Sequence, residues 1–96
     1  MFMRLTTFPL RHGSRRQVEP IADKYIQLLA QQPGYRTMTV AFDDADDEFV
    51  AVSVWDTRGH AQAATANVRD HAQVELAELM RGTPSTKILE VYEPRG

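Results

Sequence analysis

The stretch EFVAVSVW, residues 48–55, decides the fold of this chain. In an extended strand every second residue from Phe49 to Trp55 points to one face, and three valines point to the other. Both sets are largely apolar, a pattern typical of a central strand that is covered on both sides. The remaining elements follow from the periodicities on either side of this strand.

Two further strand patterns precede this stretch. Residues 2–10 and 36–42 alternate between two faces as strands do. Pro9 is expected to end the regular pairing of the first strand because it lacks an N–H group. The acidic run at residues 43–47 joins the second strand to the central one as a hairpin loop.

One helix is predicted between the first two strands. Apolar residues recur at helical spacing over residues 15–32. Ser14 and Gln17 fit a capping box at its start, in which each side chain satisfies a free backbone N–H. Pro20 is expected to disturb the first turn, and Pro33-Gly34 ends the helix.

A second helix and a last strand follow the central strand. Residues 58–81 are rich in alanine and keep helical spacing, with a break expected near residues 67–70. Asp56 or Thr57 can cap this helix. Residues 86–93 then alternate as a strand, so the last element of the chain is expected to be a strand of the sheet.

The element order βαββαβ predicts a ferredoxin-like α+β sandwich. Right-handed crossovers and hairpin pairing give a four-stranded antiparallel sheet with two helices on one face. Residues 1–96 are expected to form a single domain. The other sheet face has no cover within the chain, and an exposed apolar face of that size normally marks an interaction site. We therefore expect a homodimer in which a second copy packs sheet to sheet.

Charge and composition exclude several classes of function. A net charge of −2 argues against a protein that binds nucleic acid through its phosphates. No apolar stretch is long enough to span a membrane, and residues 1–10 show no signal-peptide pattern. The absence of cysteine excludes disulfides and thiolate metal sites. We expect a cytoplasmic protein that binds neither nucleic acid nor a membrane.

Three short motifs resemble those of a known family. They are Pro33-Gly34-Tyr35, Val52-Ser53-Val54-Trp55-Asp56-Thr57 and Val91-Tyr92-Glu93. With the βαββαβ layout, they resemble the antibiotic biosynthesis monooxygenase-like branch of the dimeric α/β-barrel superfamily. The resemblance implies a dimeric α/β barrel with a cleft between sheet and helices in each subunit. It also implies a monooxygenase that uses no cofactor and acts on a small aromatic or quinol-like molecule.

The candidate catalytic residues lie in the second predicted helix. Asn67 and His71 are four residues apart, so they are expected to share one face. A neutral histidine can accept a proton from an acidic phenol, and an asparagine amide can bind the resulting oxyanion. The deprotonated substrate would then reduce O₂ directly in a dry pocket. The alternative is a solvated helix surface.

Four further residues are candidates for substrate binding. Trp55 can stack on a planar aromatic molecule, and its alternative role is a core anchor. Arg4 and Thr6 point into the interior from a central strand. Arg4 can fix a substrate anion, although we favour a structural ion pair with Glu90. Tyr25, on the apolar face of the first helix, can line the same cleft or pack in the core.

No metal site is predicted. His12 and His60 are expected to be exposed, and the three histidines lack the spacing of metal ligands. The acidic run at residues 43–47 lacks the glycine and the spacing of an EF-hand loop, so it is interpreted as a solvated hairpin tip.

Three hypotheses for function remain. The first is a cofactor-free oxygenase whose cleft is lined by Trp55, Asn67, His71 and Tyr25. The alternative is a non-catalytic dimeric module that binds a small apolar ligand or a protein partner. An RNA-binding sheet is disfavoured because basic residues do not surround Phe49 and Trp55.

Overall fold

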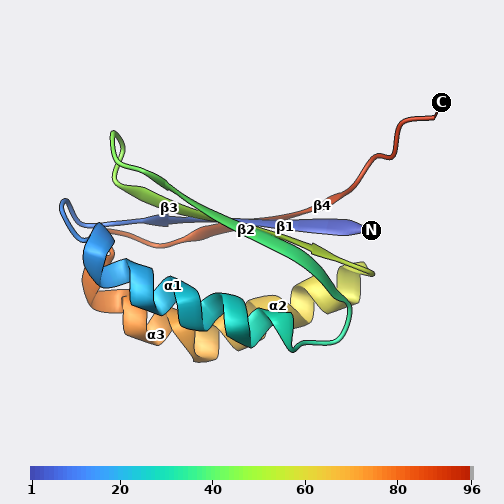
Figure 1. Cartoon of the computed structure of the whole chain (residues 1–96), viewed down its shortest axis with the longest axis horizontal. Helices are drawn as coiled ribbons and strands as arrows, with labels where there is room; N and C mark the ends of the chain where they lie inside the picture. The colour runs from blue at the N-terminus through green and yellow to red at the C-terminus, as the bar shows by residue number, and fades with distance from the viewer. Residues whose placement is uncertain (96) are drawn as a thin grey trace.

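A four-stranded antiparallel sheet carries all helices of the described chain on one face (Figure 1). The computed structural model describes residues 1–95, apart from the side chains of residues 72 and 73. The elements in chain order are β1 (Phe2–Pro9), α1 (Arg15–Ala30), β2 (Tyr35–Asp43), β3 (Glu48–Trp55), α2 (Arg58–Asp70), α3 (Ala72–Leu76), one 3-10 turn (Ala77–Leu79) and β4 (Ser85–Glu90).

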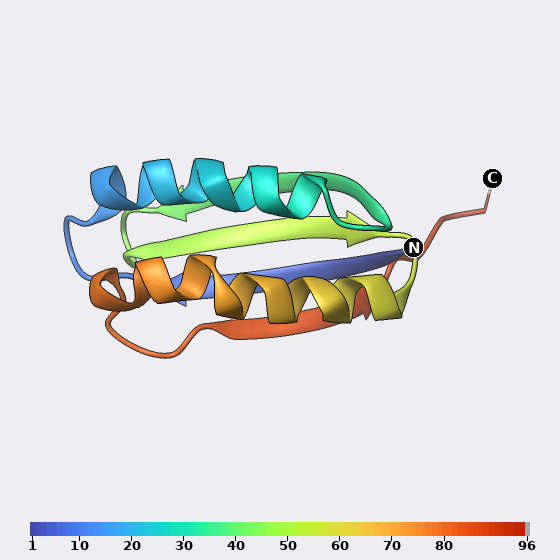
Figure 2. The same cartoon turned by 90° about the horizontal axis from the view of Figure 1, so that it is seen from below.

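The strand order β2-β3-β1-β4 confirms the predicted ferredoxin-like βαββαβ fold. β1 and β3 are the central strands, and the predicted bounds of β3 are correct. Figure 2 shows α1 and α2 running side by side across one face of this sheet, with α3 continuing the line of α2. Seen on edge in Figure 1, the opposite face carries no element of the chain.

Helix α1 begins at Arg15 as predicted, but the predicted capping box is wrong. Ser14 has a helical backbone conformation, and its side chain makes no cap hydrogen bond. A capping side chain needs an extended residue to reach the N–H groups of the first turn. The Ser14 hydroxyl is instead buried without a partner among the described residues. Pro20 lies inside the helix, where it leaves one carbonyl without its usual N–H donor.

Helix α2 is capped by Thr57, whose Oγ1 accepts a hydrogen bond from the His60 N–H at 3.1 Å. The break in the second helical segment comes later than predicted. α2 continues to Asp70, and the non-helical residue is His71, with φ −120° and ψ −70°. The chain therefore turns at His71 into the short helix α3.

The core lies between the sheet and the helices. Each inward-facing residue of β3 is buried, and α1 contributes a stripe at helical spacing to the same layer. The largest fully buried apolar and aromatic side chains are Trp55, Tyr25, Phe8, Phe49, Leu29, Leu76 and Val18. These contacts place the helices in a fixed position over the inner face of the sheet.

The outer face of the sheet is apolar in its centre. The registers of β1, β2 and β3 align Thr39, Val52 and Leu5 in one row across the sheet. Neighbouring rows bring Val54 beside Met3, and Val50 beside Thr7. These side chains are half-buried or exposed, so nothing in the described chain covers them.

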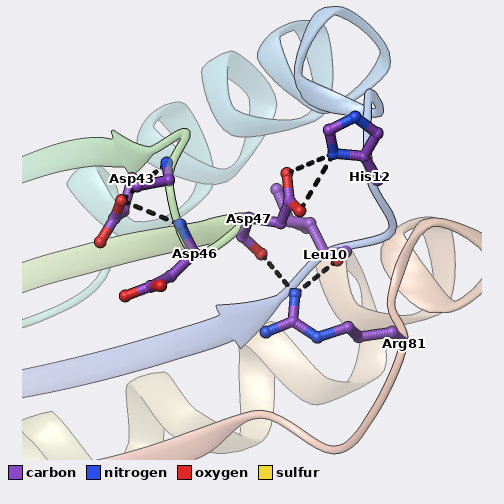
Figure 3. Close-up of polar contacts among 7 residues, drawn as sticks. Leu10, His12, Asp43, Asp46, Asp47 and Arg81 are labelled. Carbon is purple, nitrogen blue, oxygen red and sulfur yellow. Dashed lines mark hydrogen bonds and ion pairs between the residues drawn. The ribbon is translucent and has the colours of Figure 1, made fainter.

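Polar contacts tie the β2–β3 hairpin to the loop that follows β1 and to Arg81, which follows the 3-10 turn (Figure 3). Asp47 adopts a left-handed conformation with φ 52°. Its carbonyl oxygen accepts hydrogen bonds from the Leu10 N–H at 2.8 Å and the Arg81 guanidinium at 3.0 Å. Asp43 accepts two backbone N–H groups within the turn, from Ala45 and Asp46. These contacts confirm a hairpin tip stabilised by its acidic side chains.

Candidate functional site

The inner face of the sheet carries a polar stripe within an otherwise apolar core. Arg4, Thr6 and Ser53 are each no more than 2% exposed. The register of β1 and β3 places Arg4 opposite Ser53, so the two polar residues are neighbours. Buried polar side chains destabilise a core unless they are hydrogen-bonded, so each of these three is expected to have a hydrogen-bond partner.

Arg4 is held by two neutral hydroxyl groups. Its Nη1 donates to Tyr25 Oη at 2.8 Å, and its Nε donates to Thr65 Oγ1 at 2.8 Å. No aspartate or glutamate side chain of the described chain lies within ion-pair distance of Arg4. Arg4 is also the only charged side chain among the described buried residues. The guanidinium is therefore a buried cation without a counter-charge.

The predicted ion pair between Arg4 and Glu90 is wrong. The register of β1 and β4 places Glu90 opposite Phe2, whereas Arg4 faces Ile88. Glu90 is exposed at the end of the sheet. Its carboxylate stays in water, while the guanidinium of Arg4 reaches across the core to the helices.

Tyr25 stays neutral at ordinary pH. Burial raises the pKa of its hydroxyl, and the charge of Arg4 and the hydrogen bond from Arg4 oppose this only in part. Because its hydroxyl accepts a hydrogen bond from Arg4, its own hydrogen remains available for another acceptor.

A groove lies between α1 and α3, directly over Tyr25. Its volume is about 190 Å³, more than ten times the roughly 15 Å³ that one water needs. The groove is lined by Ile21, Lys24, Tyr25, Leu28, His71 and Glu75. Lys24 and Glu75 face each other from α1 and α3, with Nζ and Oε2 3.7 Å apart. This groove brings together two of the predicted site residues, Tyr25 and His71, and Arg4 lies directly behind Tyr25.

The prediction that Asn67 and His71 share one helix face is wrong. α2 ends at Asp70, so the backbone of His71 departs from the helical path. The Asn67 amide donates to Gln32 Oε1 at 2.8 Å and thereby ties α2 to the end of α1. His71 is exposed at the groove, and Asn67 is not among the groove residues.

Trp55 and Thr6 are held by contacts within the core. Trp55 is fully buried, its Nε1 donates to Ser53 Oγ at 2.9 Å, and its ring packs edge-on against Tyr35. The hydroxyls of Thr6 and Thr86 lie 3.1 Å apart across β1 and β4. Neither Trp55 nor Thr6 lines the groove.

A second hollow, of about 180 Å³, lies between the start of α1 and the β2–β3 hairpin. His12 is exposed there as predicted, and its Nδ1 lies 3.2 Å from Asp47 Oδ2. Carboxylate oxygens of Asp43, Asp46 and Glu48 lie within 4.8 Å of one another near this end. Because Asp43 already accepts two turn N–H groups, this cluster is explained by the hairpin. His60, by contrast, is half-buried.

Sequence reasoning missed Ser53, Thr65, Lys24 and Glu75. For Ser53 a signal was present, since it lies two residues before Trp55 and so on the same strand face. For Thr65 the signal was its helical spacing from the buried residues Ala61 and Val68. Lys24 and Glu75 had no such signal, because their pairing depends on where α3 lies.

The fold and the groove together define a small ferredoxin-like protein with a groove of about 190 Å³ between α1 and α3 and a buried cation behind Tyr25 of that groove. The family model for antibiotic biosynthesis monooxygenase matches residues 1–82. The chain therefore belongs to the antibiotic biosynthesis monooxygenase family, as its motifs indicated. No curated protein matches the sequence.

Solved structures show the same fold. A Nitrosomonas europaea protein named for this family superposes with a TM-score of 0.83 at 13% identity, over 99% of this chain and 93% of that one. SnoaB, a cofactor-independent oxygenase from Streptomyces nogalater, has a TM-score of 0.78 at 22% identity, over 97% and 94%. At these identities the likeness establishes the fold, and the chain is monooxygenase-like in family and architecture.

No helix in the described part of the chain is both long and apolar enough to span a membrane.

Proposed function

We propose that this chain is a cofactor-independent monooxygenase that acts on a small aromatic or quinol-like molecule in the groove between α1 and α3. The observation that carries the proposal is the Arg4–Tyr25 pair, a buried guanidinium bonded at 2.8 Å to the tyrosine that lines the groove. A preorganised donor next to a largely apolar cavity is what a reaction through a substrate anion requires.

The proposed reaction balances without an external reductant. A ring methylene flanked by aromatic groups loses a proton, and the resulting carbanion reduces O₂. Overall, CH₂ and O₂ give C=O and H₂O. The substrate supplies four electrons, one oxygen atom enters the product, and the other leaves as water. The protein has to remove the proton, hold the anion and exclude bulk water.

We assign the base to His71, which is exposed at the rim of the groove. A neutral imidazole has a basicity suited to proton transfer near pH 7. Asn67 acts as a positioning residue, because its hydrogen bond to Gln32 ties together the helices that carry the groove walls. Ile21 and Leu28 provide apolar contacts for the substrate.

We also propose that the functional unit is a homodimer formed through the outer sheet face, which makes the dimeric α/β barrel. The outer side chains in the middle of the two central strands are apolar apart from Thr7, and monomers rarely leave a contiguous apolar face in water. A two-fold arrangement covers both faces with one interface.

The proposal is tested by oxygen consumption with a panel of anthrone- and quinol-like compounds. We expect consumption with at least one compound in the absence of any added metal, flavin or haem. His71→Ala should lower kcat by about 10²-fold or more. His12→Ala is the matched control, because His12 is exposed at the other end of the molecule, and it should leave kcat unchanged.

A non-catalytic dimeric module that binds a small ligand is the second candidate function. The observation that favours it is that Trp55, Tyr25, Arg4 and Thr6 are each no more than 2% exposed, so these residues meet no solvent without a rearrangement. If no compound is consumed and a ligand still binds the groove, the module is the correct assignment and the monooxygenase is wrong.

A further inference from the structure

We propose that residues 71–75 form a lid on the groove between α1 and α3, which opens at His71 to admit a ligand and is held closed by the Lys24–Glu75 ion pair. The inference rests on the proposed function for the kind of ligand that enters. It goes further because it names the part of the chain that controls access to the groove.

The groove is too small for the proposed substrate in this structure. Its volume is about 190 Å³, whereas pockets for small organic ligands typically measure roughly 300–1,000 Å³. Tyr25, which lines the groove, is only 1% exposed. An aromatic or quinol-like molecule therefore enters only when one wall of the groove moves outward.

The wall formed by α1 is held firmly. This helix buries Val18, Ala22, Tyr25 and Leu29 beneath it and packs on β2. Moving α1 away from the sheet would expose these side chains to water and lose their hydrophobic stabilisation. α1 is therefore the wall that stays in place.

The opposite wall is held less firmly. Among the described residues it consists of His71 and Glu75. α2 packs on three strands of the sheet, whereas α3, which continues the line of α2 in Figure 2, packs mainly against the neighbouring helices. The described side chains of residues 71–75 are all exposed, and Val74 is 69% exposed. Segments that bury few apolar side chains open locally at a lower free energy than the core does.

The lid lies between two anchored points. Val68, the last buried residue of α2, is 2% exposed, and Leu76, at the end of α3, is 1% exposed. His71 interrupts the helical path between them, with φ −120° and ψ −70°, and a 3-10 turn follows Leu76. Residues at the ends of helices are the positions that absorb large changes of φ and ψ in hinge motions. The lid can therefore move while both anchors stay in the core.

One ion pair joins the lid to the fixed wall. Lys24 Nζ and Glu75 Oε2 lie 3.7 Å apart, and the two side chains are 71% and 47% exposed. No other ion pair of the described chain connects α1 with residues 71–75. Exposed ion pairs stabilise a structure only slightly. The pair therefore favours the closed lid without preventing its opening.

The first test is native-state hydrogen exchange, measured for single amides by NMR. In the wild type we expect the amides of residues 72–76 to exchange at least about tenfold faster than those of residues 22–29 in α1. Lys24→Met should raise the exchange rate of the lid about two- to fivefold, because it removes the ion pair. Arg16→Met is the matched control, because it removes an exposed charge of α1 that forms no ion pair with a described residue, and it should leave the lid unchanged.

The second test closes the lid with a cross-link. The chain contains no cysteine, so the double variant Lys24→Cys/Glu75→Cys offers only two thiols, which a short bis-maleimide can join across the groove. The matched control is the same variant with each thiol capped by N-ethylmaleimide. Cross-linking should slow exchange in the lid, and it should lower oxygen consumption about tenfold or more relative to the capped variant.

The outcomes separate the lid from the proposed function. Exchange of residues 72–76 only through global unfolding overturns the lid, and an unchanged lid in Lys24→Met overturns the role of the ion pair. Equal oxygen consumption by the cross-linked and capped variants retains the monooxygenase and overturns the lid. Fast exchange that the cross-link suppresses, without oxygen consumption by the wild type, retains the lid and overturns the monooxygenase. If capping alone abolishes oxygen consumption, the exchange rates of the wild type and Lys24→Met decide the outcome.

Discussion

Each face of the sheet carries some side chains of the kind expected on the other face. The inner face buries Arg4, Thr6 and Ser53 beneath the helices. The outer face leaves Leu5 and Val52 on the side that carries no helix. Physical expectation alone would place the polar residues outside and the apolar ones inside. Each face therefore departs from the simplest rule. Arg4 has no counter-charge within ion-pair distance, and the apolar outer side chains have no cover within the described chain.

The comparison teaches that stability and function are divided between the faces. Inside, the polar stripe costs stability, and under the proposed function it is retained for binding, which is the pattern expected at a functional site. Outside, the apolar rows gain stability only when they are covered. The proposed substrate anion and the proposed second copy are the two missing partners.

The largest effect is expected at the most buried point of the inner face. Trp55→Ala should lower the free energy of unfolding by about 3–5 kcal/mol, because it leaves a cavity and an unpaired Ser53. Urea unfolding measures this change. Tyr92→Ala, at a side chain that is 78% exposed, should stay within about 0.5 kcal/mol of the wild type. A small loss at Trp55 would mean that this end of the core is loosely packed.

The second test breaks the outer face. Val52→Lys places a charge in the central row between Leu5 and Thr39. We expect the mass measured by light scattering to fall from twice 10.9 kDa to 10.9 kDa, because a buried charge at the centre of an interface costs about 2 kcal/mol or more. Gln17→Lys on exposed α1 is the matched control and should remain dimeric. A wild type that is monomeric at micromolar concentration contradicts the proposed dimer.

The third test removes the charge from the inner face. Arg4→Met keeps a long side chain and relieves the buried cation, so the free energy of unfolding should not fall and should rise by up to about 2 kcal/mol. Equilibrium unfolding in urea checks the sign. A loss of more than about 1 kcal/mol would show that the hydrogen bonds to Tyr25 and Thr65 outweigh the cost of burying the charge.

The smallest effect is a dependence of stability on alkaline pH. The pKa of Tyr25 lies above its ordinary value of 10.0 because the side chain is buried. The unfolded chain loses the Tyr25 proton near pH 10, whereas the folded chain keeps it to a higher pH. Stability therefore falls as the pH rises above about 10. The slope contributed by Tyr25 is at most about 1.4 kcal/mol per pH unit. Thermal unfolding between pH 9 and 11 should show a shallower decline for Tyr25→Phe.

Most of the fold could be predicted from local patterns. The alternation in residues 48–55 is unbroken, so the strand and its central place were both correct. The start of α1 at Arg15 was also correct, but its cap was not, since Ser14 offers a capping side chain whose use depends on its backbone conformation. The break near His71 was also placed too early, because where a helix turns depends on its packing against a neighbouring element.

The candidate site was less predictable than the fold. Periodicity placed Arg4, Thr6 and Tyr25 on inward faces correctly. It could not show that Arg4 bonds to Tyr25 and not to Glu90, because the partner depends on the register of β4 and on the distance to α1. Interactions between elements that are distant in sequence leave no periodic signal in any one of them.

The strand order also has a consequence for biosynthesis. β1 pairs with β3 and β4, so Leu5 lies between Val52 and Lys87. A nascent chain that has emerged only as far as Trp55 has one edge of β1 unpaired beside an apolar face, and such edges recruit other chains. The interval between the synthesis of β3 and that of β4 is therefore the period in which the free edge of β1 is open to pairing with other chains.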